Sequence, residues 1–134
     1  MDIKMKPQVI KLAAGAGRSY ELPGMRAIFK ADEAETKEAY SVSEWWLDPR
    51  TAGPGAHSHD ANDEVFYGIG GVMAVLVGEE WYDIGPGDFL RIPAGTIHDF
   101  EKRTDARAGL LNFFIPGGFE RNMPAIVNWF KENG

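Results

Sequence analysis

Alternation of apolar and polar residues dominates the pattern of this chain. Residues 39–47 alternate with the period of two that sends successive side chains to opposite faces of a strand, and they are rich in strand-forming residues. Residues 25–31 and 108–115 are also predicted as strands, and residues 71–77 are apolar on both faces, as in a strand covered on both sides. Residues 8–12 predict a further short strand near the N-terminus. The pattern therefore indicates a protein built from strands.

Clusters of turn-forming residues divide the second half of the chain. Clusters at residues 78–80, 85–88 and 93–95 contain glycine, proline or aspartate, and each is followed by a short stretch that we predict as a strand. Residues 32–36 are predicted as an acidic turn exposed to solvent. Short strands separated by frequent turns are typical of a β-sandwich or β-barrel.

Only the C-terminal tail has the periodicity of a helix. Pro124 suits a first helical position, and Ile126, Val127 and Phe130 recur at helical spacing. We expect a short amphipathic helix that closes one end of the barrel.

The adjacent residues Trp45 and Trp46 must face opposite sides of their strand. The loop at residues 48–55 breaks the alternation between this strand and the next segment. The sequence therefore does not say which of the two tryptophans faces the interior.

Composition narrows the class of protein. The chain has 134 residues, 44% of them hydrophobic, which suits one globular domain. Its 14 basic and 20 acidic residues give a net charge of −6, which argues against nucleic acid or an anionic membrane as partner. Cysteine is absent, which excludes a disulfide framework and thiolate metal ligands and fits a cytoplasmic protein. No apolar stretch predicts a signal peptide or a membrane span.

All three histidines of the chain fall in two short segments with metal-ligand spacing. His57 and His59 lie two residues apart, so on an extended strand their imidazoles project from the same face. Glu64 follows His57 by an odd offset of seven, and we expect the turn-forming residues 60–63 to reset the phase and bring it round. With His98 they offer three imidazoles and one carboxylate to a divalent transition metal. The alternative is a barrel that binds no metal.

The spacing of these residues resembles a known family. The pattern His-x-His-x4-Glu-x6-Gly, followed by Gly-x5-Pro-x-Gly-x2-His, is similar to the two motifs of the cupin superfamily, and 15 residues separate Gly71 from Gly87 as in small microbial cupins. Thr51 stands where the first motif usually opens with glycine, and Lys102 where the second usually ends with asparagine. The stretch from Phe113 to Glu120 resembles small quercetin-dioxygenase-like cupins of the cupin 2 type.

The resemblance implies an all-β fold, a double-stranded β-helix or jelly-roll barrel with a short C-terminal helix. The whole chain, 1–134, would form a single cupin domain. Within it we expect an N-terminal strand and loops at 1–24, the barrel at 25–116, and a C-terminal loop and helix at 117–134.

The parity of the strands predicts the lining of a pocket beside the metal. Phe66 shares a face with Glu64, and Phe100 shares one with His98. On the last strand the interior face is expected to carry a polar residue among apolar ones. The predicted pocket residues are Phe66, Phe100, Asn112 and Phe114. The alternative for each of them is a place in the barrel core.

The expected chemistry follows from the ligand set. Three neutral imidazoles and a carboxylate around a divalent ion leave a net charge of about +1, which favours an anionic ligand. Nitrogen and oxygen ligands suit Fe, Mn, Ni, Cu, Zn or Co, so one divalent transition metal of unknown identity is expected.

We expect a dioxygenase-type oxidoreductase that acts on a small aromatic or enolic metabolite, as the resemblance to quercetinase-like cupins implies. A non-redox isomerase or lyase, and a cupin that binds metal and ligand without turnover, are the alternatives. We also expect a homodimer, because four tryptophans and eight phenylalanines exceed what one small barrel readily buries.

Overall fold

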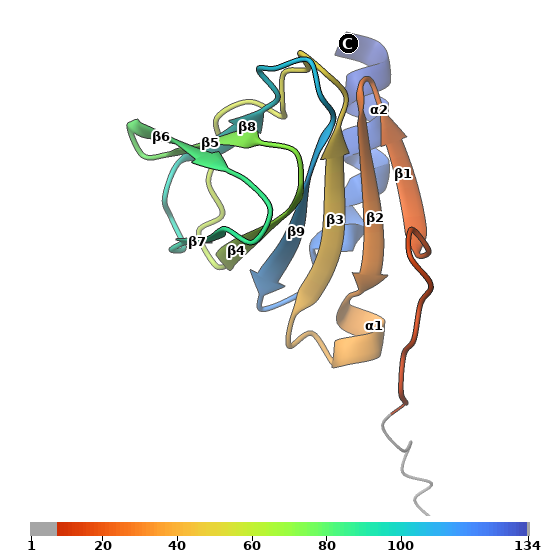
Figure 1. The fold of residues 1–134 in the computed structure, drawn as a ribbon. Coiled ribbons are helices and arrows are strands. Elements are labelled where there is room, and N and C mark those ends of the chain that lie inside the picture. Colours follow the sequence, from red (N-terminus) through yellow and green to blue (C-terminus); the bar gives the residue numbers. More distant parts are fainter. Residues whose placement is uncertain (1–7, 134) are drawn as a thin grey trace, which may run out of the picture.

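Residues 8–133 of the chain are described by the computed structural model, and they form two antiparallel sheets followed by a C-terminal helix (Figure 1). The larger sheet has the strand order β1 (Arg18–Leu22), β2 (Met25–Ala31), β3 (Ser41–Leu47), β9 (Ala108–Ile115), β4 (Asp63–Gly70) and β7 (Phe89–Ile92). The smaller sheet has the order β6 (Glu80–Ile84), β5 (Met73–Val77) and β8 (His98–Glu101). The helices are α1 (Glu33–Thr36), the 3₁₀ helix η1 (Phe119–Asn122) and α2 (Met123–Asn133).

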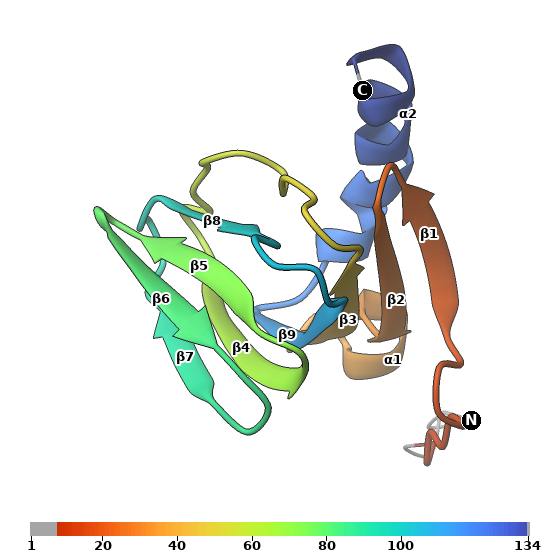
Figure 2. The ribbon, with the colours of Figure 1, turned by 45° about the horizontal axis from the view of Figure 1, so that its top comes forward.

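The two sheets enclose one apolar core, so the predicted all-β jelly roll, a double-stranded β-helix, is confirmed. Figure 2 shows the smaller sheet facing the β4 and β9 side of the larger one, with α2 beside β1 and β2. Buried side chains from both sheets and from Met123 at the start of α2 pack together. Every pairing between named strands is antiparallel, as expected when one face of each sheet covers the core.

The two adjacent tryptophans of β3 face opposite sides of the larger sheet. Trp45 points into the core and is 8% exposed, and its indole nitrogen donates a hydrogen bond to Ser43. Trp46 points outward, where the guanidinium of Arg107 lies 4.3 Å from its ring centroid. The choice that the sequence left open is therefore settled in favour of Trp45 as the interior residue.

Strand prediction succeeded where each strand has neighbours and failed at the N-terminus. The strands at residues 25–31 and 108–115 have the predicted bounds. The strand predicted at residues 8–12 was wrong, because this stretch is irregular and Val9 is 95% exposed. Strand-forming residues need a partner strand for their backbone groups, and within the described part of one chain this stretch has none. The first strand begins instead at Arg18.

The acidic stretch after β2 was predicted as a solvated turn; residues 34 and 35 are exposed as expected, but the conformation is helical and Asp32 is buried. The stretch forms the one-turn helix α1, and the buried Asp32 caps it by accepting a hydrogen bond from the backbone of Glu33. The same carboxylate accepts hydrogen bonds of 2.6 Å from the backbone N–H groups of Gly118 and Glu120. Asp32 therefore ties the β2–β3 connection to the segment that leads into α2.

The predicted C-terminal helix is confirmed as α2, although it begins at Met123 and follows the unpredicted η1. Ile126, Val127 and Phe130 are half-buried and pack against the core, as their spacing predicted. Within residues 8–133, no helix combines the length and the apolar character needed to cross a membrane.

Candidate metal centre

Two of the histidines are joined by a backbone bridge between distant parts of the chain. The backbone N–H of His57 donates to the carbonyl of His98 at 2.9 Å, and the N–H of His98 donates to the carbonyl of His57 at 2.7 Å. The sequence predicted an extended strand through His57 and His59, whereas the structure has only this single bridge. The bridge still fixes the two imidazoles side by side, with ring centroids 4.4 Å apart.

A tight turn brings Glu64 to the same place. Residues 60 and 61 form the turn, and β4 begins at Asp63 with Glu64 on its interior face, 3% exposed. The carbonyl of His59 accepts a hydrogen bond from the backbone N–H of Gly95, which holds this turn against the β7–β8 connection. The predicted change of phase between the histidines and Glu64 is therefore present.

Close packing under the histidine loop requires a glycine. A Cβ atom at Gly53 would lie 1.7 Å from the carbonyl oxygen of Phe100. Any residue other than glycine would therefore clash with the backbone of Phe100. The loop before His57 consequently runs in contact with the backbone of β8, the strand that begins with His98. This contact places two ligand-bearing segments that are about forty residues apart in sequence next to each other.

The four predicted ligand residues form one cluster. His57, His59, Glu64 and His98 can each offer one ligand atom, and these atoms all lie within 4.8 Å of one another. The Nε2 atoms of His59 and His98 lie 3.3 and 2.8 Å from Oε1 of Glu64. These separations suit atoms that surround one ion at metal–ligand distances of about 2.0–2.2 Å.

Three of the cluster's atoms are buried without a hydrogen bond among the described residues: Nε2 of His59, Nε2 of His98 and Oε1 of Glu64. Buried polar atoms are almost always paired, because an unpaired one loses its hydration without compensation. A divalent cation would satisfy all three atoms together. The donor set and the unpaired atoms therefore fit a transition metal.

Hydrogen bonds at Nδ1 of two imidazoles also favour metal binding through their Nε2 atoms. Nδ1 of His57 lies 2.7 Å from the carbonyl oxygen of Gly55, and Nδ1 of His98 lies 2.9 Å from that of Thr96. A carbonyl oxygen only accepts, so Nδ1 carries the hydrogen in each ring and Nε2 keeps its lone pair. This tautomer is the one that metal-bound histidines use, with the second nitrogen fixed by a backbone carbonyl.

Asn112 orients the carboxylate of Glu64. Its side-chain nitrogen donates a 2.8 Å hydrogen bond to Oε2 of Glu64, and both residues are buried. Because Oε2 is occupied by this bond, Oε1 is the oxygen that faces the histidines. Oδ1 of Asn112 is buried and has no partner among the described residues, so it remains free to accept a hydrogen bond.

The surroundings shift the pKa values of the half-buried His59 and the buried His98 in opposite directions. Burial lowers the pKa of His59 below its usual range, against the attraction of the nearby Glu64. Burial would lower the pKa of His98 as well, but the Glu64 carboxylate outweighs it and raises that pKa. The cause of the rise is the short contact of 2.8 Å between Oε1 of Glu64 and Nε2 of His98, across which a carboxylate attracts a protonated imidazole.

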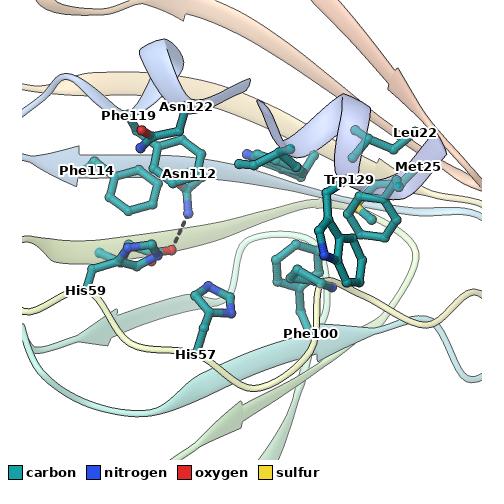
Figure 3. A pocket seen from close by; sticks show the side chains of 15 residues that line it. Leu22, Met25, His57, His59, Phe100, Asn112, Phe114, Phe119, Asn122 and Trp129 are labelled. Atoms are coloured by element: carbon teal, nitrogen blue, oxygen red, sulfur yellow. Dashed lines mark hydrogen bonds and ion pairs between the residues drawn. The ribbon is translucent and has the colours of Figure 1, made fainter. Parts of the chain in front are cut away.

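A mostly apolar cavity of about 380 Å³ opens beside the cluster (Figure 3). Of the four predicted pocket residues, Phe100, Asn112 and Phe114 line it. The fourth, Phe66, is 1% exposed and packs edge-to-face on Phe100 in the core, which is the alternative that the sequence left open for it. His57, His59 and Glu64 line the cavity too.

Several lining residues were not predicted. Phe119 stacks on Phe114, with ring centroids 4.3 Å apart, and turns its edge toward His59 at 5.6 Å. Asn122 and Trp129 also line the cavity from η1 and α2. The helical periodicity of the tail identified its apolar face but not the cavity that this face covers. The cavity becomes visible only when α2 is placed beside β1 and β2 in the structure.

The two departures from the motifs face each other away from the cluster. The backbone N–H of Lys102 donates to the carbonyl of Thr51 at 2.9 Å, and the buried ammonium of Lys102 bonds to the hydroxyl of Thr104. Neither Thr51 nor Lys102 belongs to the ligand cluster or to the cavity lining. Both residues therefore help to hold the loops behind the site in place and do not contact the ligand cluster.

Comparison with known proteins agrees with the fold and the cluster. The sequence model of the family described as "Cupin domain" matches residues 43–114, which contain all four ligand residues. This chain belongs to the cupin family.

Among curated proteins, this cupin is similar to quercetin 2,3-dioxygenase of Bacillus subtilis (strain 168). The two are 34% identical over 65 residues, which is 48% of this chain and 19% of that protein. The similar segment is thus less than a fifth of the length of the curated relative.

Solved structures of other cupins share the fold. A structure of oxalate decarboxylase from Bacillus subtilis, a protein with Mn(II) centres, has a TM-score of 0.72 at 23% identity and covers 89% of this chain and 32% of that one. A sugar phosphate isomerase of the cupin superfamily from Silicibacter pomeroyi has a TM-score of 0.67 at 21% identity, covering 78% of this chain and 74% of that one. Identities this low establish the common fold alone.

Proposed function

We propose that this cupin is a metal-dependent enzyme, a dioxygenase-type oxidoreductase that acts on a small aromatic or enolic metabolite. The observation that carries the proposal is the position of the ligand cluster, which borders a cavity lined mostly by carbon atoms. Cupins include enzymes with different reactions, so the proposal rests on this site and not on the fold.

The residues of the site divide the work between holding an ion and shaping its surroundings. His57, His59, His98 and Glu64 would hold one divalent transition metal at a net charge of about +1, which attracts a deprotonated ligand such as an enolate or catecholate. A redox-active metal bound there supplies one-electron chemistry with dioxygen. Four protein ligands leave room for exogenous ligands on a five- or six-coordinate ion.

The cavity walls favour a flat or apolar substrate. Phe100, Phe114 and Phe119 line the cavity beside the cluster with aromatic surface that excludes water and can pack against a ring or a conjugated chain. The unpaired oxygen of Asn112 offers an acceptor to a hydroxyl group of the ligand. A sugar phosphate finds no lysine or arginine among the lining residues, which argues against the isomerase alternative.

The test is oxygen consumption by protein loaded with Fe²⁺, Mn²⁺, Ni²⁺ or Cu²⁺ on a panel of flavonols, catechols and 1,3-diketones. We expect uptake of dioxygen with at least one metal and one substrate, and no uptake by the metal-free protein or by the His98→Ala variant. Tight binding of these compounds by metal-loaded protein without oxygen uptake would contradict the dioxygenase proposal and favour a non-redox enzyme or a binding protein.

A further inference from the structure

The cavity has a metal-binding side and an apolar side. His57, His59 and Glu64 border it on one side. On the other side lies a set of side chains that we call the apolar wall: Leu22, Met25, Ile126, Trp129 and Phe130. Figure 3 shows Trp129, Met25 and Leu22 across the cavity from His59 and Phe114.

The apolar wall comes from outside the residues that match the family. Its members belong to β1, β2 and α2, whereas the family match covers residues 43–114. Ile126, Trp129 and Phe130 share one face of α2, because residues three and four apart are neighbours on a helix. The wall is therefore a property of this chain's own terminal segments, and can differ between cupins that share the metal motifs.

The members of the apolar wall differ in their exposure to solvent. Ile126 and Phe130 are half-buried against the core, but Trp129 is 55% exposed while its indole turns edge-to-face on Phe130, with ring centroids 5.0 Å apart. A large aromatic side chain at the rim of a cavity gains free energy when a ligand covers it. Trp129 is thus placed to contact whatever part of a ligand extends out from the metal side.

The wall carries no charge and no strong hydrogen-bond acceptor. None of its five side chains carries a charge or a hydrogen-bonding oxygen, and the only polar hydrogen belongs to the Trp129 indole. A ligand whose anionic group binds a metal held by His59 and Glu64, and which is long enough to cross the cavity, lays its far end against this surface. Polar atoms there would lose their hydration without compensation, whereas methylene groups gain by burial.

We infer that the apolar wall determines specificity, selecting ligands with an anionic metal-binding head and an apolar tail that runs along α2. This inference deepens the proposed function and rests on it only for the binding of the head group. The cavity volume of about 380 Å³ lies near the lower end of the range of about 300–1,000 Å³ for ligand pockets, so the tail is short.

Calorimetric titration of Zn²⁺-loaded protein with 2,4-pentanedione, 2,4-heptanedione and 2,4-nonanedione tests the inference. The three enolisable diketones have the same head and tails of increasing length, and Zn²⁺ permits binding without redox turnover. We expect the affinity of the wild-type protein to rise about fourfold for each methylene that the wall covers.

Two variants and a control assign the effect to the wall. Ile126→Trp should fill the path of the tail, so that 2,4-nonanedione loses about tenfold or more in affinity while 2,4-pentanedione binds as before. Trp129→Ala should reduce the gain per methylene to about twofold or less. Trp81→Ala removes an exposed tryptophan from β6, outside the cavity lining, and should leave the whole series unchanged.

Affinity that does not depend on tail length in the wild-type protein, or failure of all three diketones to bind, overturns the inference. An equal loss for every diketone in Ile126→Trp also overturns it, since that result means general damage. The oxygen-uptake assay described above decides the proposed function separately. The wall can select tails on a protein that consumes no oxygen, and a protein that consumes oxygen can bind all three diketones equally well.

Discussion

The orientation of the Glu64 carboxylate depends on one residue, Asn112. Parity along β9 predicted that Asn112 faces the interior, and it does. Its bond to Glu64 depends on the pairing of β4 with β9, which places Glu64 opposite Phe114 and Phe66 opposite Asn112. This register joins residues that are 48 positions apart and leaves no signal in a single sequence.

Replacing Asn112 by leucine tests its role. Asn112→Leu keeps the approximate volume and removes the donor to Oε2 of Glu64, so the carboxylate loses its fixed orientation. We expect metal affinity to fall by about 10–100-fold with the protein still folded. Competition with a chromophoric chelator measures the affinity. The exposed residue Asn128 on α2 provides a matched control, and Asn128→Leu should bind metal like the wild type.

Metal affinity should depend on pH through the imidazoles. A protonated histidine has no lone pair to offer, so protons and metal compete for Nε2 of His57, His59 and His98. Because Glu64 raises the pKa of His98, affinity should begin to fall above the usual imidazole pKa near 6.5 and should keep falling as the pH drops below it. Metal titrations between about pH 5 and pH 8 check this. An affinity that stays constant over this range would exclude the histidines as ligands.

At the scale of elements, the segment from Gly118 to Glu120 links the sheets to the helix that borders the cavity. Asp32 accepts two backbone hydrogen bonds from this segment, and Arg18 pairs with the Glu120 carboxylate at 2.7 Å. Between these anchors Phe119 stands against Phe114 and His59. The anchors therefore hold the Phe119 ring in its place in the cavity lining.

The variant Asp32→Ala should destabilise this connection. It leaves the buried backbone donors of Gly118 and Glu120 unpaired and removes the cap of α1, so we expect a loss of roughly 2–4 kcal/mol in the free energy of unfolding. Urea denaturation followed by tryptophan fluorescence measures it. Asp83→Ala removes an exposed carboxylate on β6 and should change stability by less than about 0.5 kcal/mol. Equal losses in both variants would argue against the anchoring role.

Local pattern predicted most elements, and long-range packing accounts for the rest. Alternation and turn residues gave the bounds of β2 and β9, and motif spacing gave all four residues of the ligand cluster. The burial of Asp32 could not be predicted, and the choice between pocket and core for Phe66 could not be made, because each depends on which segments pack together. A charge run such as residues 32–36 looks solvated until a partner for its carboxylate is known.

At the scale of the whole molecule, we expect two copies of the chain to associate. Val9, Ile10 and Leu12 are exposed in the single chain although their sequence has strand character. Pairing of residues 8–12 with a second copy would cover these side chains and give their backbone N–H and C=O groups hydrogen-bond partners.

Sedimentation at micromolar concentration should give a species of twice 14.8 kDa. Ile10→Asp should weaken the dimer, whereas Val72→Asp, at another exposed apolar position, should not. A 14.8 kDa wild-type species would contradict this expectation.

The central claim is that one metal ion binds to each chain through His57, His59, Glu64 and His98. Elemental analysis of the purified wild-type protein beside His59→Ala and His98→Ala tests it most directly, with circular dichroism to show that each variant keeps its strands. The account predicts about one transition-metal ion per wild-type chain and a large loss of occupancy in both variants, because each has lost one of four ligands. Equal metal content in all three proteins would contradict it.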